Sequence, residues 1–265
     1  MVPIEKSDFG GLFTPEQARL SGLSFAEPSK VACVFCGREL EPLGALLQGK
    51  VMWVSHIPCG CEGEREEAEE AERREKAAAE EAMARKVSAA GIRKRFRDAQ
   101  TSIPAAISYL EAFGDNRGRG LYIRGGTGAG KTTAACAIAR ALVYSGYSVR
   151  VTTTLAMLDT IHDGYDAGTR GASALSAWTC CDLLVLDDLG KENANSWAMT
   201  TLFQVVNERY EAMLPTIYTS QYQIDDIEKR MSRAREHETA AAIASRIRET
   251  CEVVDIGNRD RRRRF

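Results

Sequence analysis

From residue 91 to residue 261, short apolar runs alternate with longer segments of helical character. Apolar runs bounded by turn residues are typical of strands buried on both faces, and their alternation with helices is typical of a parallel sheet. Strands are predicted at residues 121–123, 148–153, 182–187, 216–219 and 252–256. Helices are predicted at residues 104–113, 132–143 and 196–213, two short ones between 219 and 252, and an irregular segment after 153. The pattern predicts an α/β fold whose parallel sheet carries helices on both faces.

Residues 62–90 follow a different pattern, with no proline and mostly Glu, Ala, Arg and Lys. Glu70 with Arg74 and Glu81 with Arg85 are favourable pairs four residues apart, which supports a helix. The apolar positions are almost all Ala, so the seam of a coiled coil is missing. We interpret this segment as a charged, solvated connecting helix, with a partner-binding helix as the alternative. Three parts are therefore expected: residues 1–61, 62–90 and 91–265.

Composition narrows the class of protein. The chain has 265 residues and a formal net charge of −2, which gives no overall nucleic-acid signature. No stretch is long and apolar enough for a membrane span, so a cytoplasmic protein without membrane contact is expected. The eight cysteines occur beside a phosphate-loop motif, which argues against a secreted disulfide framework. Cys136, Cys180, Cys181 and Cys251 fall in predicted helices or strands and are expected in the core.

A full G-x-x-x-x-G-K-[ST] motif follows the strand predicted at residues 121–123. Glycines let the backbone turn its N–H groups toward a phosphate, and the helix that follows adds positive potential at its N-terminus. Lys131 is expected to reach the β- and γ-phosphates, and the Thr132 hydroxyl to ligate Mg²⁺. The alternative is a glycine-rich turn that matches by chance. The predicted nucleotide-binding residues are Gly125, Gly126, Thr127, Gly128, Ala129, Gly130, Lys131, Thr132 and Thr133.

A second motif supports the first, because the apolar strand at residues 182–187 ends in two carboxylates. In parallel sheets the chemistry lies at the carboxyl ends of the strands. Asp187 is expected in the Mg²⁺ shell, and Asp188 is expected to polarise the attacking water. The alternative is that both residues only cap a turn. Together the motifs predict binding of ATP with Mg²⁺.

Four cysteines lie in the first part of the chain. Cys33 and Cys36 form a C-x-x-C-G knuckle, and Cys59 and Cys61 form a C-x-C pair. Two such pairs can supply a closed tetrahedral S₄ site for Zn²⁺, and His56 is an alternative to one thiolate. The metal would stabilise a domain with few large apolar residues. A redox-active pair and unliganded thiols are the competing interpretations.

With these motifs in order, residues 91–261 resemble the AAA+ ATPases of the DnaC/DnaI helicase-loader group. The transposon-encoded IstB ATPases are close relatives of that group. The more specific marks are the Asp-Asp-Leu-Gly sequence at 187–190 and the tail at 257–261, where the group usually has Gly-x-x-x-Arg. The cysteine-bearing N-terminal part is similar to the DnaI-type layout. That resemblance implies that residues 1–61 contact the replicative helicase.

The resemblance also implies roles for single residues. Ser220 or Gln221 would serve as sensor 1 at the end of a strand, where family members often have Asn. Arg246 aligns with the arginine finger that reaches a neighbouring subunit's nucleotide, and Arg248 is its nearest rival. Arg261 matches a sensor-2-like arginine that contacts the nucleotide of its own chain. The catalytic residues implied are thus Lys131, Asp188, Arg246 and Ser220 or Gln221.

The segment at 152–179 resembles the helical insertion with which helicase loaders and initiators face single-stranded DNA. Arg170 is its one candidate phosphate contact in the stretch 164–177, and Tyr165 and Trp178 are candidate stacking platforms. DNA binding is therefore expected to be weak and to depend on assembly.

The leading hypothesis from sequence is an ATP-dependent loader of a hexameric DnaB-type replicative helicase onto single-stranded DNA, forming a homo-oligomer when ATP is bound. An IstB-like transposition ATPase and a nucleotide-gated adapter with little hydrolysis stay open as alternatives.

Overall fold

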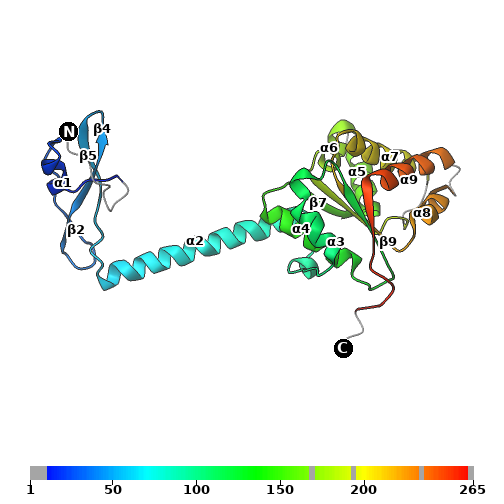
Figure 1. The fold of residues 1–265 in the computed structure, drawn as a ribbon, viewed down its shortest axis with the longest axis horizontal. Coiled ribbons are helices and arrows are strands. Elements are labelled where there is room, and N and C mark those ends of the chain that lie inside the picture. Colours follow the sequence, from blue (N-terminus) through cyan, green and yellow to red (C-terminus); the bar gives the residue numbers. More distant parts are fainter. Residues whose placement is uncertain (1–10, 167–170, 192–194, 233–235, 262–265) are drawn as a thin grey trace. The chain divides into compact units, whose positions relative to one another are not determined.

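The computed structural model describes residues 11–166, 171–191, 195–232 and 236–261 (Figure 1). The chain divides into two compact units, Met1–Glu80 and Glu81–Phe265. Helix α2 (Glu62–Ala89) begins in the first unit and ends in the second. No helix within the described ranges has the length and apolar character needed to cross a membrane.

The first unit has a small sheet with strand order β1-β5-β4, in which β1 is Ser24–Phe25, β4 is Pro42–Leu47 and β5 is Lys50–His56. Helix α1 (Pro15–Leu20) packs on it, starting at a capping box in which Thr14 and Gln17 bond each other's backbone. Its buried core consists of Phe13, Ala18 and Val51, with Leu23, Phe25 and Trp53 at the edge. A two-stranded ribbon, β2 (Val31–Ala32) and β3 (Glu39–Leu40), carries the first cysteine pair at its turn.

Helix α2 confirms that residues 62–89 are helical and charged, as predicted. Both quoted ion pairs form, with Arg74 2.9 Å from Glu70 and Arg85 2.6 Å from Glu81. Almost every side chain of the helix is exposed until its last two turns, where Met83 and Val87 join the core of the second unit. The helix is therefore held by helix propensity and local charge pairs along most of its length.

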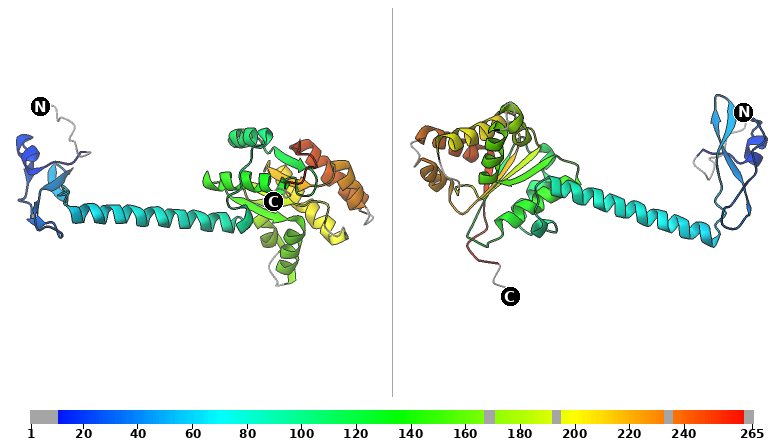
Figure 2. Two further views of the ribbon diagram at one scale, coloured as in Figure 1. Left: turned by 90° about the horizontal axis from the view of Figure 1, so that it is seen from below. Right: turned by 180° about the vertical axis from the view of Figure 1, so that it is seen from behind.

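The second unit is built on a five-stranded parallel sheet with strand order β10-β6-β9-β8-β7 (Figures 1 and 2). Every neighbouring pair is parallel. The strands are β6 (Gly120–Arg124), β7 (Val149–Thr153), β8 (Leu183–Asp187), β9 (Thr216–Ser220) and β10 (Cys251–Asp255). All five predicted strands are thus confirmed, with ends shifted by a residue or two.

Helices cover both faces of this sheet, as predicted. Side chains such as Ile123 and Val185 pack on the first face, under α3 (Pro104–Glu111), α4 (Lys131–Tyr144) and the end of α2. Their strand neighbours, such as Tyr122 and Leu186, pack on the second face. That face is covered by α5 (Thr154–Asp166), α6 (Gly171–Thr179), α7 (Ser196–Glu211), α8 (Ile224–Met231) and α9 (His237–Thr250).

Three expectations from the pattern were wrong. The segment after residue 153 is helical, which corrects the irregular structure expected from the pattern and agrees with the helical insertion that the resemblance implied. The Thr153 hydroxyl accepts the Ala156 N–H at the start of α5, and Met157 and Ile161 bury one face of the helix. The helix α9 is long rather than short. Cys180 is exposed, since it follows α6 at a bend on the surface, whereas Cys136 and Cys181 are buried and Cys251 is half-buried.

Candidate functional site

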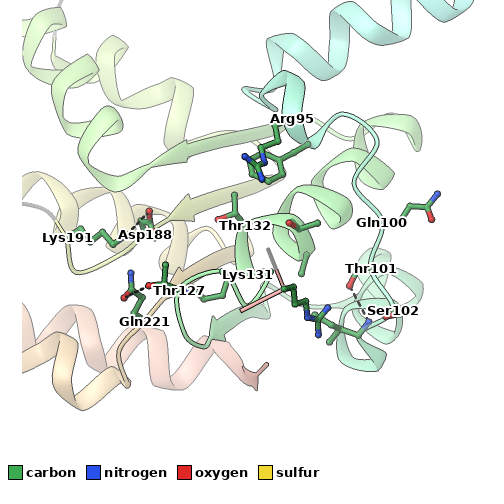
Figure 3. Close-up of a pocket in the computed structure, with 17 residues that line it drawn as sticks. Arg95, Gln100, Thr101, Ser102, Thr127, Lys131, Thr132, Asp188, Lys191 and Gln221 are labelled. Atoms are coloured by element: carbon green, nitrogen blue, oxygen red, sulfur yellow. Dashed lines mark hydrogen bonds and ion pairs between the residues drawn. The ribbon is translucent and has the colours of Figure 1, made fainter. Parts of the chain in front are cut away.

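The phosphate-loop motif lies between the end of β6 and the start of α4. Gly128 and Gly130 have φ of 78° and 103°, which side-chain-bearing residues rarely adopt. Lys131 is buried, and its Nζ donates to the carbonyl oxygens of Gly125 and Gly126, 2.9 Å away in each case. The loop therefore wraps around the side chain of Lys131, which also lines the cavity in front of the loop (Figure 3).

The chain that follows β10 lies directly on this loop. The Gly126 N–H donates to Gly257 O at 2.9 Å, and the Arg261 N–H donates to Gly128 O at 3.0 Å. A Cβ built on Gly128 would overlap the Asp260 carboxylate. Gly128 is thus required by its backbone angle and by the tail that packs against it.

Asp187 lies at the carboxyl end of β8, next to the start of α4. The Thr132 hydroxyl donates to both of its carboxylate oxygens, at 2.9 and 3.1 Å, and the Thr219 hydroxyl donates to Oδ1 at 2.6 Å. Burial raises the pKa of the Asp187 carboxyl, and these two hydrogen bonds oppose the rise. Two oxygen donors side by side, Thr132 Oγ1 and the carboxylate, form a set that suits Mg²⁺.

Asp188 follows in a left-handed conformation, with φ of 61°. Its backbone N–H donates to the Thr219 hydroxyl at 3.0 Å, and its carboxylate pairs with Lys191 at 3.0 Å. Asp188 lines the cavity beside the loop, whereas Asp187 lines a smaller cavity together with Thr132.

A cavity of about 550 Å³ opens in front of the loop. Of the predicted residues, Thr127, Gly128, Gly130, Lys131, Thr132, Thr133, Asp188, Gln221 and Arg261 line it. Its remaining wall comes from Lys191, Ala134 and the segment between α2 and α3, where Arg95, Phe96, Gln100, Thr101, Ser102 and Ile103 contribute. Thr101 and Ser102 precede Ile103, the N-cap of α3, and line the cavity.

The two candidates for sensor 1 have different surroundings. Ser220 is fully buried, and its hydroxyl donates to Leu189 O at 2.8 Å. Gln221 lines the cavity, where its Oε1 accepts the Thr127 hydroxyl at 3.2 Å. The arrangement therefore leaves Gln221 as the candidate that can face a bound nucleotide.

The two candidate arginine fingers lie on α9, outside the cavity lining. Arg246 donates to Asn207 Oδ1 at 2.8 Å and lies over the rings of Phe203 and Tyr210. Arg248 is held between Asp225 and Glu228, each at 2.7 Å. Two carboxylates neutralise Arg248, so Arg246 is the better candidate for a contact with another subunit.

The predicted DNA contacts are scattered. Tyr165 is exposed on α5, and Trp178 is half-buried on α6. Arg170 lies outside the described residues. Within the described residues, Tyr165 and Trp178 neither stack on nor hydrogen-bond to each other.

Sequence reasoning missed Thr219, which is fully buried and bridges the Asp187 carboxylate and the Asp188 backbone N–H. It also missed Arg95 and Phe96, which reach the cavity from a 3-10 turn, η1 (Lys94–Phe96). A threonine as the fourth residue of an apolar strand was the available signal for Thr219; the adjacency of the two strands was not visible in the sequence.

The four predicted cysteines of the first unit converge. Their sulfur atoms lie within 4.8 Å of one another, with Cys33 3.7 Å from Cys61 and Cys36 3.7 Å from Cys59. Zn–S bonds of about 2.3 Å in a tetrahedron imply sulfurs about 3.8 Å apart, so the spacing fits Zn²⁺. Backbone N–H groups of Cys36 and Phe35 lower the pKa of the Cys33 thiol to about 7. Within the described residues, the cluster of possible metal ligands consists of the four cysteines and does not include His56, the predicted alternative ligand.

The parallel sheet, the phosphate loop and the paired carboxylates define a P-loop nucleotide-binding protein with the AAA+ fold. A family model narrows the class further. Residues 65–265 match the IstB-like ATP binding protein family, and the chain belongs to it.

Curated relatives include the replicative helicase loader DnaI of Bacillus subtilis, 26% identical over 143 residues, which are 53% of this chain and 46% of DnaI. The replicative helicase loader DnaC of Escherichia coli is 28% identical over 116 residues, 43% of this chain and 47% of DnaC. The chain therefore spans about half the length of the curated relatives it matches.

The crystal structure of the DnaC helicase loader has a TM-score of 0.53 and 22% identity, and the match covers 62% of this chain and 99% of that chain. This likeness supports the fold.

We predict that Thr219→Val lowers the rate of ATP hydrolysis about tenfold. Valine keeps the shape of threonine but loses a hydrogen bond to the half-buried Asp187 carboxylate, and a bond to a charged group is worth about 1.5–3 kcal/mol. Thr219→Ser, which keeps the hydroxyl, should stay within about threefold of wild type. Steady-state phosphate release at saturating ATP and Mg²⁺ measures both, and thermal melting checks the fold. Wild-type turnover by Thr219→Val would show that the bridge to Asp187 and Asp188 has no part in the chemistry.

Proposed function

We propose that this protein is an ATP-dependent loader of a hexameric replicative DNA helicase onto single-stranded DNA. The observation that carries the proposal is the pairing of a full ATP site in one unit with a separate four-cysteine module in another. The connecting helix α2 is long and solvated. Two matched relatives are named replicative helicase loaders, which agrees with this architecture.

The residues that line the cavity have different roles in ATP hydrolysis. Lys131 and the loop amides bind the β- and γ-phosphates, and Asp188 polarises the attacking water, which Gln221 orients. Arg261, carried by the tail on the loop, contacts the phosphates from the same chain. Mg²⁺, held by Thr132 and Asp187, would neutralise charge on the β- and γ-oxygens.

Arg246 acts on the nucleotide of a neighbouring subunit in this proposal. It lies outside the cavity of its own chain, and Asn207 with two aromatic rings fixes its guanidinium. A fixed guanidinium is suited to spreading charge on a transferred phosphoryl group. Hydrolysis would then require a homo-oligomer.

The cysteine cluster holds a structural Zn²⁺, and residues 1–61 form the helicase-binding domain. The apolar cluster of Phe13, Ala18 and Val51 is a very small core, so a metal would stabilise the fold. Residues 62–90 then act as a linker helix and residues 91–265 as the ATPase domain.

A nucleotide-gated adapter is the second candidate, because Lys191 pairs with Asp188 and would weaken it as a base. The family name favours an IstB-like transposition ATPase as a third, and the four-cysteine module argues against it.

We predict that Lys131→Ala weakens ATP binding and that Asp188→Asn binds ATP but hydrolyses it at least about tenfold more slowly. Lys131 supplies the phosphate clamp, whereas Asp188 acts on the water. Equilibrium binding and phosphate release separate the two effects. Equal behaviour of wild type and both variants, in preparations free of contaminating ATPases, would refute the site assignment.

We predict that the purified protein contains zinc bound by the four-cysteine cluster. Elemental analysis of protein purified under reducing conditions without chelator should find about one Zn²⁺ per chain. Cys33→Ser with Cys36→Ser should lose the metal and unfold residues 1–61 while leaving nucleotide binding intact. Cys180→Ser, a change at an exposed cysteine outside the cluster, is the matched control and should keep the metal. Metal-free wild-type protein would contradict the assignment.

Loading itself can be measured with the full chain and the hexameric replicative helicase of the native cell. On circular single-stranded DNA coated with single-strand-binding protein, the wild type should increase helicase transfer in the presence of ATP, and Lys131→Ala should not. The cysteine double variant should fail to retain the helicase on a column. Full loading by Asp188→Asn would favour the adapter, and no helicase contact by the wild type would exclude a loader.

A further inference from the structure

The 3-10 turn η1 lies against the start of α4, beside the phosphate loop. Phe96 packs on the apolar core and lines a small cavity that it shares with Thr132 and Asp187. Within the turn, the Phe96 N–H donates a hydrogen bond to Arg93 O at 2.8 Å. The Arg97 guanidinium donates to Ser88 Oγ of α2 at 3.3 Å. The core contact and the two bonds fix the backbone of η1 next to the ATP site.

Arg95 and Phe96 of this turn both line the main cavity, and Arg95 is the charged one. It is exposed, and among the described residues no carboxylate pairs with it and no acceptor bonds it. Two other cations at the wall are already engaged, since Lys131 donates to loop carbonyls and Lys191 pairs with Asp188, and the third, Arg261, is tied to the loop through its backbone N–H. An arginine without an acidic partner, in the wall of a cavity for a polyanion, is available for a phosphate.

The position of Arg95 complements that of Lys131. In the view of Figure 3, Arg95 lies on one side of Thr132 and Lys131 lies on the other. Asp188, Lys191 and Gln221 gather at a third side, where the γ-phosphate would be hydrolysed. A guanidinium offers several N–H donors in one plane and binds two phosphate oxygens at once, which an ammonium group does not.

We propose that Arg95 binds the phosphate chain of the nucleotide, so that the triphosphate is held between Lys131 and Arg95. The proposal rests on the ATP site of the proposed function and adds a ligand that the phosphate-loop motif does not contain. Because η1 starts only a few residues after α2 ends, the same contact would tie nucleotide binding to the end of the linker helix.

The test uses the full chain and two neighbouring positions. Arg95→Ala and Arg95→Glu each remove the proposed contact, and Lys94→Ala and Lys94→Glu are the matched controls. Lys94 lies on the same turn, is exposed and is not in the cavity lining, so it makes the same charge change without the contact. Calorimetry with Mg·ATP and Mg·ADP measures affinity.

We expect Arg95→Ala to raise the Kd for ATP about tenfold, the loss typical of one charge-assisted contact, and Arg95→Glu to raise it further. Both Lys94 variants should stay within about twofold of wild type. Hydrogen exchange of the amides at 93–99 should slow when ATP binds to the wild type and to Lys94→Ala, but not to Arg95→Ala.

Equal affinities for the Arg95 and Lys94 variants would overturn the proposal, as would ATP-dependent protection of residues 93–99 in Arg95→Ala. Unchanged nucleotide affinity with lost DNA binding or assembly would assign Arg95 to another partner and also overturn it. If Arg95→Ala did not fold, the comparison of Arg95→Glu with Lys94→Glu would decide. Failure of the ATP site itself is distinguishable, because wild type would then not bind ATP and Lys131→Ala would change nothing.

Discussion

The half-buried carboxylate of Asp187 is the group around which the chemistry of the nucleotide-binding unit is arranged. A charge partly removed from water is costly unless it is hydrogen-bonded, and two hydroxyls, from Thr132 and Thr219, donate to this one. Thr132 belongs to the helix after the phosphate loop, and Thr219 to the neighbouring strand β9. Hydrogen bonding to this one carboxylate therefore fixes helix α4, strands β8 and β9 and the turn at Asp188 relative to one another.

The amino ends of the central strands β8 and β9 are stabilised in a different way. Arg209 of α7 is fully buried and donates to Thr216 Oγ1 and to the carbonyl oxygens of Trp178, Cys181 and Pro215. Burial lowers the pKa of its guanidinium. Three of these acceptors lie at or just before the starts of β8 and β9, and Trp178 lies in α6. Within the described residues no carboxylate pairs with Arg209, so its hydrogen bonds tie the two strands together at the end away from the phosphate loop. The carboxyl ends of the strands, where Asp187 and Asp188 lie, are thus available for metal and phosphate. Arg209, at the amino ends of β8 and β9, has a structural role.

The parts of the site that the sequence could predict are those whose chemistry is local. The phosphate loop and Asp187 with Asp188 are contiguous motifs, and the fold follows from apolar runs at strand length. Thr219 acts through a strand pairing, Gln221 and Ser220 differ in the direction of their side chains, and Arg95 reaches the cavity through the packing of Phe96. These features depend on contacts between distant segments. The exposed Cys180 was missed because adjacent cysteines at a helix end point to opposite environments.

The tail at 257–261 explains why the loop and the C-terminal segment behave as one structure. The Gly126 N–H and the Gly128 carbonyl, both in the phosphate loop, are each bonded to the tail backbone, while the Asp260 carboxylate fills the space beside Gly128. The same bonds bring Arg261 to the wall of the cavity. A segment that follows the last strand thus supports the loop after the first strand of the sheet, because β10 and β6 are neighbours. Parallel pairing of these two strands brings their carboxyl ends together, and this makes a cationic ligand from the tail available to the nucleotide of the same chain.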